Sequence, residues 1–396
     1  MTSFLNLSRI QEAICGEKLD GWLFCNFHHR DRLADDILHI NRKDTNSRLW
    51  FYAVPAEGEP FGIINAVEPG ILDKLPGQKT EYFGREELMA LLKTLGGKRW
   101  GVHISDTLTM VSYLDRGTAA VLESAGLELA SAAGLVQRFK GILDGEGIAS
   151  HERAAVALYD VVEQTWGTVR KAYIDKTPLS EGDLLRVMTA AVEDRGLITD
   201  HAPIIAAGAN AGNPHYSCDG TGAPIREGAV IQFDLWAKER DPGAIYADIS
   251  WVGVFAPAPS AEYEKAFREL VSAREGVYEY IAGEIAAGRT ISGAMADAKA
   301  REALVSLGYG TELKHRTGHG IDTQCHGSGV NIDSWEFPDT RPILEGSCFS
   351  LEPGIYFSGF GMRTEVNVYI KDGRAIISQG DRRQFTLLNC QPGTAR

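Results

Sequence analysis

The chain has 396 residues, of which 44% are hydrophobic and 23% are charged, and its formal net charge is −13. This length predicts more than one domain, and the composition is typical of a soluble globular protein with a sizeable core. The acidic balance argues against nucleic acid or an acidic membrane surface as a general partner, because both favour basic patches.

Targeting and redox signals are weak in this sequence. No stretch approaches the roughly 20 apolar residues that a membrane-spanning helix requires, so no membrane span is expected. The opening MTSFLNLSRIQEAIC has no basic region followed by an apolar one, which argues against a secretory signal. The cysteines, at positions 15, 25, 218, 325, 348 and 390, show no CxxC spacing and are expected to be free thiols. A cytoplasmic location is therefore expected.

Residues 1–147 show strand-like runs that alternate with helical segments. After a leading helix, strands are expected at 21–25, 48–55, 61–67, 99–104 and 127–130, with helices near 85–95 and 116–126. This alternation predicts an α/β domain with a mostly parallel or mixed sheet covered by helices. No GxGxxG motif follows a strand, so a dinucleotide site is not supported. His28, His29 and His39 lie in a polar stretch, where solvated or packing roles are expected.

The acidic, glycine-rich segment 140–150 lacks a clear period and predicts a domain boundary, with a second domain at 148–396. A helix is predicted from His151, and another from Ser180 to Gly196, where Asp183 would complete a capping box. The following segments are strands at 203–208, 229–237 and 245–255, helices at about 260–283 and 291–307, and strands around 348–352, 365–370 and 375–378. Helices followed by strands, twice over, predict an α+β domain and hint at an internal duplication.

Two of these strand-like runs carry a single acidic residue each. Asp234 lies in IQFDLWAK and Asp248 in IYADISWVGVF. Burying an unpaired carboxylate is costly, so each needs a cation or several hydrogen bonds. Glu352 ends the run CFSLE, and Glu365 begins EVNVYI.

If these four carboxylates converge, they repel one another unless a cation lies between them. One or two divalent ions would resolve the conflict, and oxygen ligands with the imidazole of His319 suit Mn²⁺, Co²⁺, Fe²⁺ or Zn²⁺. An Asp at a strand end is also a common cap or ion-pair partner. Residue types and order alone therefore leave both interpretations open.

The five residues stand in the local motifs FDLW, ADIS, HRTGHG, LEPGIY and RTEV. In this order the chain resembles the pita-bread metallopeptidases of family M24, in the two-domain Xaa-Pro aminopeptidase and prolidase branch. The resemblance is weak over the first domain and extends motif by motif from about residue 150. It implies a creatinase/prolidase-type N-terminal α/β domain and a pita-bread catalytic domain. It also implies that Asp234 chelates one metal, that His319 and Glu352 chelate the other, and that Asp248 and Glu365 bridge them.

The function implied by this resemblance is hydrolysis that depends on two divalent ions, Mn²⁺ being the most expected. The substrate would be a short peptide, cleaved before proline at its N-terminus by a hydroxide that bridges the metals. Glu352 would accept the proton, while His215 of NPHY and His326 would donate hydrogen bonds to the developing oxyanion or the leaving group. The two-domain members of the branch are often homodimers, so a homodimer is expected.

Further positions match the family's substrate pocket, namely His315, Tyr356 and Arg363. Two positions depart from its pattern, which commonly reads GHGIG and then HE or HD, because Asp322 replaces the last glycine and Gly327 follows His326. The residue after the Arg-x-Glu motif also departs, being Val366 and not the usual Asp. These changes could alter which substrate is accepted.

Other functions stay open at this point. One alternative is a C–N hydrolase of the creatinase or ectoine-hydrolase type on the same fold, and another is a non-catalytic peptide-binding protein. A nucleophilic pair of Cys325 and His326 is not favoured, because neighbouring residues of a strand point to opposite faces.

Overall fold

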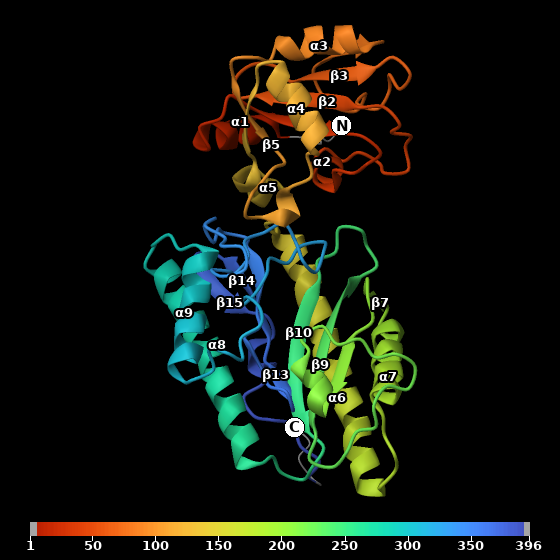
Figure 1. Ribbon diagram of the computed structural model, residues 1–396, viewed down its shortest axis with the longest axis vertical. Helices are drawn as coiled ribbons and strands as arrows, with labels where there is room; N and C mark the ends of the chain where they lie inside the picture. The colour runs from red at the N-terminus through yellow and green to blue at the C-terminus, as the bar shows by residue number, and fades with distance from the viewer. Residues whose placement is uncertain (1–5, 392–396) are drawn as a thin grey trace. The chain divides into compact units, whose positions relative to one another are not determined.

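The computed structural model describes residues 6–391. The contacts divide the chain into two compact units, one ending at Lys140 and the other beginning at Gly141 (Figure 1). None of the described helices combines the length and the apolar composition that crossing a bilayer requires. All six cysteines are free thiols, as the sequence predicted.

A six-stranded sheet in the order β4-β3-β2-β1-β5-β6 forms the first unit. Its strands are β1 (Gly21–Asn26), β2 (Trp50–Pro55), β3 (Phe61–Asn65), β4 (Gln78–Tyr82), β5 (Arg99–Val102) and β6 (Glu128–Ser131). Its helices are α1 (Leu7–Gly16), α2 (Arg32–Ile37), α3 (Arg85–Lys93), α4 (Arg116–Ser124) and α5 (Ala133–Phe139), with a 3₁₀ turn at Thr109–Val111. Because β1 runs antiparallel to β2 and parallel to β5, the predicted mixed sheet is confirmed.

Both faces of this sheet are covered. Trp22 and Phe24 of β1 enter one apolar cluster, while Leu23 and Cys25 enter another, as alternation along a strand buried on both faces requires. The sequence did not predict β4, because this edge strand is polar and buries only Tyr82. The short helices α2 and α5 were also missed.

The second unit repeats one order of elements, as the sequence predicted. The first half holds α6 (Gly145–Asp175), α7 (Glu181–Asp194), β7 (Leu197–Ile198), β8 (Ile204–Ala207), a 3₁₀ turn at Gly208–Gly212, β9 (Val230–Glu239) and β10 (Ala247–Val254). The second holds α8 (Ala261–Ala286), α9 (Gly293–Ser306), β11 (Cys348–Leu351), β12 (Gly354–Tyr356), β13 (Gly361–Arg363), β14 (Val366–Lys371), β15 (Arg374–Ile377) and a 3₁₀ turn at Gly380–Arg382.

The two helix pairs flank the strands of this unit (Figure 1). Helix α6 packs on α7 and against β9 and β10, while α8 packs on α9 and against β15. Strand β10 also contacts β14, which joins the two halves. The predicted site residues lie on these central strands and on the loops beside them.

Local signals explain where the first helix pair begins and ends. Ser180 and Asp183 form the predicted capping box of α7. Gly196, which follows the helix, has φ 73°, a left-handed conformation that favours glycine. Helix α6 begins at Gly145, earlier than the sequence indicated, because the Asp144 side chain accepts a hydrogen bond from the Gly147 amide and caps the first turn.

Candidate metal centre

The antiparallel pairing of β9 and β10 sets the positions of two acidic side chains. Asp234 lies opposite Ser250, and Asp248 lies two residues before Ser250. Residues two apart on a strand share a face, so Asp234 and Asp248 are diagonal neighbours on one side of the pair.

A second pair of strands positions the two glutamates. The ladder between β11 and β14 ends at the pair Leu351 and Val366. Glu352 leaves β11 one residue later, and Glu365 enters β14 one residue earlier, so the two glutamates continue the ladder on facing chains. Pairing of these two strands therefore brings together residues from the LEPGIY and RTEV motifs.

The segment that carries His319 lies beside β11. The His319 amide donates to Ser350 Oγ over 3.0 Å, and the Ser350 amide donates to the His319 carbonyl over 2.9 Å. A Cβ atom at Gly318 would lie 2.0 Å from the Ser350 carbonyl oxygen, so only glycine permits this approach. The glycine before His319 is thus explained by the close packing of two backbone segments.

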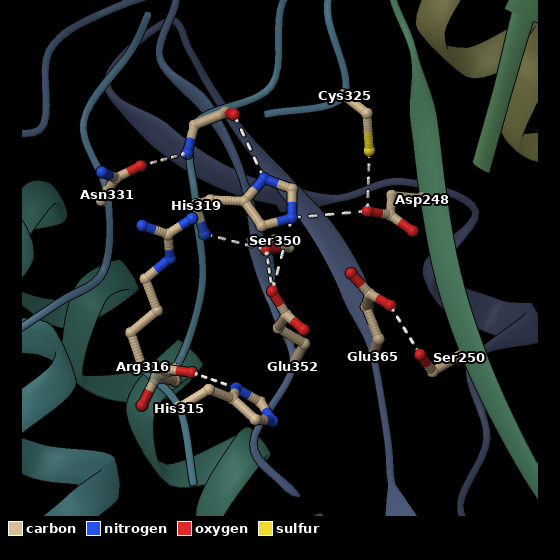
Figure 2. Close-up of polar contacts among 12 residues, drawn as sticks. Asp248, Ser250, His315, Arg316, His319, Cys325, Asn331, Ser350, Glu352 and Glu365 are labelled. Carbon is tan, nitrogen blue, oxygen red and sulfur yellow. Dashed lines mark hydrogen bonds and ion pairs between the residues drawn. The ribbon is translucent and has the colours of Figure 1, made fainter. Parts of the chain in front are cut away.

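These elements bring all five predicted ligands together. Donor atoms of Asp234, Asp248 and Glu365 lie within 4.8 Å of one another, and so do those of His319, Glu352 and Glu365. Figure 2 shows the carboxylates of Asp248, Glu352 and Glu365 and the ring of His319 turned toward one another. Glu365 belongs to both groups, which are therefore adjacent.

The tautomer of His319 leaves a lone pair facing carboxylates. Its Nδ1 lies 3.2 Å from the Gly320 carbonyl oxygen and can only donate there. Burial, and then the charge of Arg316, lower the pKa of His319 to about 3, so the ring is neutral and Nε2 carries no proton. Nε2 lies 3.4 Å from oxygens of both Asp248 and Glu352. A lone pair facing anionic oxygens is the arrangement that a cation stabilises.

The carboxylates themselves resist ionisation where they lie. Burial, and then the charge of Asp234, raise the pKa of Asp248 to about 8. Burial also raises the pKa of Glu352 to about 8 and that of Glu365 well above its ordinary value. Within the described residues, Asp248 Oδ1 and Glu365 Oε1 are buried without a hydrogen-bond partner. Oxygen donors with one imidazole nitrogen suit Mn²⁺, Co²⁺, Zn²⁺ or Fe²⁺, so the residues fit divalent ions.

Arg363 and Ser250 complete the wall of this cluster. The Arg363 guanidinium is paired with Asp234 and donates from Nε to Ser250 Oγ over 3.0 Å. The Ser250 hydroxyl in turn lies 2.9 Å from Asp234 Oδ1 and 2.8 Å from Glu365 Oε2 and donates to one of them at a time. Ser250 was missed by the sequence analysis, although its place two residues after Asp248 in ADIS puts both on one strand face.

The predicted pocket residues form a chain of hydrogen bonds. Arg363 Nη1 donates to the Tyr356 hydroxyl over 2.9 Å, and Tyr356 lies 2.7 Å from His315 Nε2. His315 Nδ1 donates to the Arg316 carbonyl oxygen over 2.6 Å, so Nε2 accepts from Tyr356. Burial, and then Arg363, lower the pKa of His315 to about 3, in agreement with a neutral ring.

The two remaining histidines are exposed beside the cluster. The ring of His326 lies 4.3 Å, centroid to centroid, from that of His319. His319, and then burial, lower the pKa of His326, and His215 lies near enough to contribute. The loop of His215 contacts the cluster through Pro214, whose carbonyl accepts from Arg363 Nη1 over 3.3 Å.

Cys325 and His326 point in different directions. Cys325 is buried and donates from Sγ to Asp248 Oδ2 over 3.1 Å, whereas the His326 side chain is exposed. This geometry agrees with the expectation that they do not form a nucleophilic pair.

Glu181, at the start of α7, was missed by the sequence analysis. It is fully buried, and its Oε1 accepts from the Ala207 amide and the Asn210 side chain. Its Oε2 accepts from the Tyr216 hydroxyl over 2.8 Å and from the Ala223 amide over 2.7 Å. Glu181 therefore holds the loop that carries His215. The sequence SEGD contains a second acidic residue besides the aspartate of the capping box, and this was the signal that could have revealed Glu181.

Comparison with known proteins identifies the family of the second unit. The model of metallopeptidase family M24 matches residues 149–372, more than half of the chain. An Xaa-Pro dipeptidase of Lactobacillus helveticus is 31% identical over 186 residues, which are 45% of this chain and 45% of that relative, so the match spans less than half of its length.

Solved structures share the fold over nearly the whole chain. Dipeptidase PepE from Mycobacterium ulcerans superposes with a TM-score of 0.73 at 20% identity, covering 97% of this chain and 96% of that one. The N-terminal domain of FACT complex subunit SPT16 from chickpea, Cicer arietinum, gives a TM-score of 0.69 at 11% identity, over 95% of this chain and 96% of that one. At these identities the likeness concerns the fold alone. By the family match over its second unit, the chain belongs to metallopeptidase family M24.

Proposed function

We propose that this protein is a peptidase that depends on two divalent ions and cleaves the bond before proline at the N-terminus of a short peptide, as an Xaa-Pro aminopeptidase or dipeptidase. The observation that carries the proposal is the convergence of four carboxylates with an imidazole lone pair in a buried setting, where the guanidinium of Arg363 is paired with one of the carboxylates, Asp234. The similarity to an Xaa-Pro dipeptidase supports the substrate class.

Each ligand has a place in this proposal. Asp234 would hold one ion, His319 and Glu352 the other, and Asp248 and Glu365 both. The ions would polarise the scissile carbonyl and lower the pKa of a water molecule at the site. The positive charge of the ions would offset the cost of bringing four carboxylates together, because a nearby opposite charge favours the ionised form of a carboxylate.

Glu352 is the candidate for accepting the proton of the attacking water. Its side chain is 14% exposed, compared with 6% for Asp248 and 11% for Asp234, so it is the carboxylate of these three most open to a substrate. His326 and His215 are exposed and would donate hydrogen bonds where negative charge develops on the carbonyl oxygen or the leaving nitrogen. One side of the proposed substrate pocket would be held in place by the hydrogen bonds that connect His315, Tyr356 and Arg363.

The first experiment measures metal content and turnover. The purified protein should contain, or take up, two equivalents of a divalent ion such as Mn²⁺ and then hydrolyse an Xaa-Pro dipeptide or an Xaa-Pro-Xaa tripeptide. Turnover of the dipeptide alone would identify a dipeptidase. Metal binding without hydrolysis of any Xaa-Pro peptide would favour the alternatives, a C–N hydrolase of the creatinase or ectoine-hydrolase type or a non-catalytic peptide-binding protein.

Glu352→Gln tests the proposed proton acceptor. We expect kcat to fall by about 10²–10⁴-fold, the range of general acid–base catalysis, because an amide cannot take the proton. The matched control is Glu302→Gln, the same change on the exposed surface of α9, where the side chain is 72% exposed. Circular dichroism should be unchanged in both variants. Wild-type activity in Glu352→Gln would remove Glu352 from this role.

We also propose Mn²⁺ as the preferred ion, a cytoplasmic location and a homodimer. Static light scattering measures the mass directly, and the mass of a single chain at working concentration would contradict the dimer.

A further inference from the structure

The carboxylate of Asp248, a candidate ligand of both ions, has an incomplete set of partners. Its Oδ1 is buried without a hydrogen-bond partner within the part of the chain that the structure describes. Its Oδ2 accepts from the Cys325 thiol over 3.1 Å and lies 3.4 Å from His319 Nε2. Cys325 therefore reaches the metal centre through Asp248, although it is none of the five candidate ligands.

The backbone of Asp248 is fixed by a different residue. Its amide donates to Asn367 Oδ1 over 2.8 Å, and its carbonyl oxygen accepts from Asn367 Nδ2 over 2.7 Å. These two hydrogen bonds hold the peptide groups on either side of the Asp248 Cα and do not reach the carboxylate. The orientation of the carboxylate therefore depends on its own contacts, among which is the hydrogen bond from the Cys325 thiol.

A thiol in this position could bind an ion itself or donate to a ligand. Donor atoms of Asp248, His319 and Cys325 lie within 4.8 Å of one another, close enough for a shared ion. The His319 ring, however, donates from Nδ1, so its lone pair is at Nε2, and this atom lies 3.4 Å from oxygens of both Asp248 and Glu352. In Figure 2, Cys325 approaches Asp248 from the side away from Glu352 and Glu365. The lone pair and the two glutamates thus favour an ion on the other side of Asp248 from the thiol.

We propose that Cys325 is an outer hydrogen-bond donor of the metal centre, whose thiol stays on Asp248 when the ions are bound and fixes the orientation of that carboxylate. Outer partners of this kind orient the ligands of a metal site and tune its affinity. A thiol is a weak donor, so it orients the carboxylate and leaves most of the negative charge available to the ions. Cys325 is then a positioning residue, and this role rests on the proposed function.

Mn²⁺ binding to variants at position 325 tests this role. In isothermal titration calorimetry, Cys325→Ala should show dissociation constants about 10–100-fold above those of the wild type, the usual effect of removing an outer partner. Cys325→Ser keeps a hydroxyl donor and should lie between the two. If Cys325→Ala does not fold, Cys325→Val removes the donor while filling the volume of the thiol, and the same loss is expected.

The matched control removes another buried thiol. Cys390 is 0% exposed, compared with 3% for Cys325, and its Sγ donates to the Val254 carbonyl oxygen over 3.7 Å and not to a candidate ligand. Cys390→Ala should bind Mn²⁺ as the wild type does. Equal affinities of the position-325 variants that lack a donor and of Cys390→Ala would overturn the proposal.

Cobalt substitution separates a donor from a ligand and needs only the wild type and Cys325→Ser. A thiolate bound to Co²⁺ gives an intense sulfur-to-metal charge-transfer band in the near ultraviolet. The Co²⁺-loaded wild-type protein should lack this band, and its spectrum should match that of Cys325→Ser. A band in the wild type that disappears in Cys325→Ser would make Cys325 a ligand and overturn its role as an outer donor.

Failure of this role and failure of the proposed function give different results. If Cys325→Ala weakens ion binding but the wild type hydrolyses no Xaa-Pro peptide, the peptidase function fails and the role of Cys325 stands. If the wild type hydrolyses the peptide and Cys325→Ala binds ions as tightly as the wild type, the reverse holds. A wild-type protein that binds no divalent ion would overturn both.

Discussion

Buried carboxylate oxygens are the residue-scale feature that most strongly requires a ligand. Asp248 Oδ1 and Glu365 Oε1 lack partners within the described residues, in surroundings where an unpaired polar atom is costly. Arg363 supplies one positive charge, and it is paired with Asp234. A single guanidinium cannot neutralise four carboxylates, so protons or metal ions must supply the rest.

The metal-free protein should therefore show a pH dependence that metal removes. The folded-state pKa values of Asp248 and Glu352, about 8, lie above their ordinary values of 3.8 and 4.5. A raised folded-state pKa means that the folded chain binds the proton more tightly, so this contribution to stability is full at low pH and is lost as pH rises through about 8. Divalent ions compete with these protons.

We expect Mn²⁺ to stabilise the folded protein more at about pH 8 than at about pH 5. At the higher pH, fewer protons have to leave the carboxylates when the ion binds. Thermal unfolding with chelator and with Mn²⁺, repeated across this range, measures it as the difference between the two midpoints. A difference that stays constant or shrinks toward high pH would contradict the raised pKa values.

Strand register is the element-scale feature that assembles the centre. The pairing of β9 with β10 sets the diagonal of Asp234 and Asp248, and that of β11 with β14 brings Glu352 opposite Glu365. A slip of one residue in either ladder would turn the carboxylates to the other face.

Helix α7 contributes to the site by holding a loop, because Glu181 in its first turn accepts hydrogen bonds from the loop that carries His215.

Glu181→Gln should loosen that loop. The amide replaces one acceptor oxygen with a donor that faces other donors, which costs about 1–3 kcal/mol for an unsatisfied buried group. We expect kcat for an Xaa-Pro peptide to fall while metal content is kept, because His215 is displaced and the ligand strands are not. Glu193→Gln, the same change at an exposed position of α7, is the control. Equal activity of the two variants would show that Glu181 does not position His215.

At the scale of the whole molecule, the centre belongs to one unit. All five candidate ligands, together with Arg363 and Ser250, lie after Gly141. The second unit has its own apolar clusters, one of them formed by α6 and α7 against β9 and β10. It therefore contains both the ligands and a core of its own.

We expect a fragment of residues 141–396 to fold and to bind two divalent ions with the same stoichiometry as the full chain. Isothermal titration calorimetry with Mn²⁺ on the fragment and on the full chain compares them directly. A folded fragment that binds no metal would show that the first unit is needed to complete the centre.

The sequence by itself determined the local features of this protein. The period of apolar residues predicted most helices and strands, the SEGD sequence predicted the cap of α7, and the acidic residues in apolar strands marked the candidate ligands. These signals are local, because a strand face or a helix cap is encoded within a few residues. The polar edge strand β4 carries no such period and was missed.

Only the tertiary structure decided how distant segments meet. The roles of Ser250 and Glu181 depend on partners that lie as far along the chain as Glu365 and Ala223. The sequence marked Asp322 only as a departure from the family pattern, whereas the fold buries it and its carboxylate accepts from the Gln324 and Ser328 amides. Sequence spacing does not specify which backbone segments approach closely, and that approach decides whether a carboxylate binds a cation, caps a loop or faces a substrate.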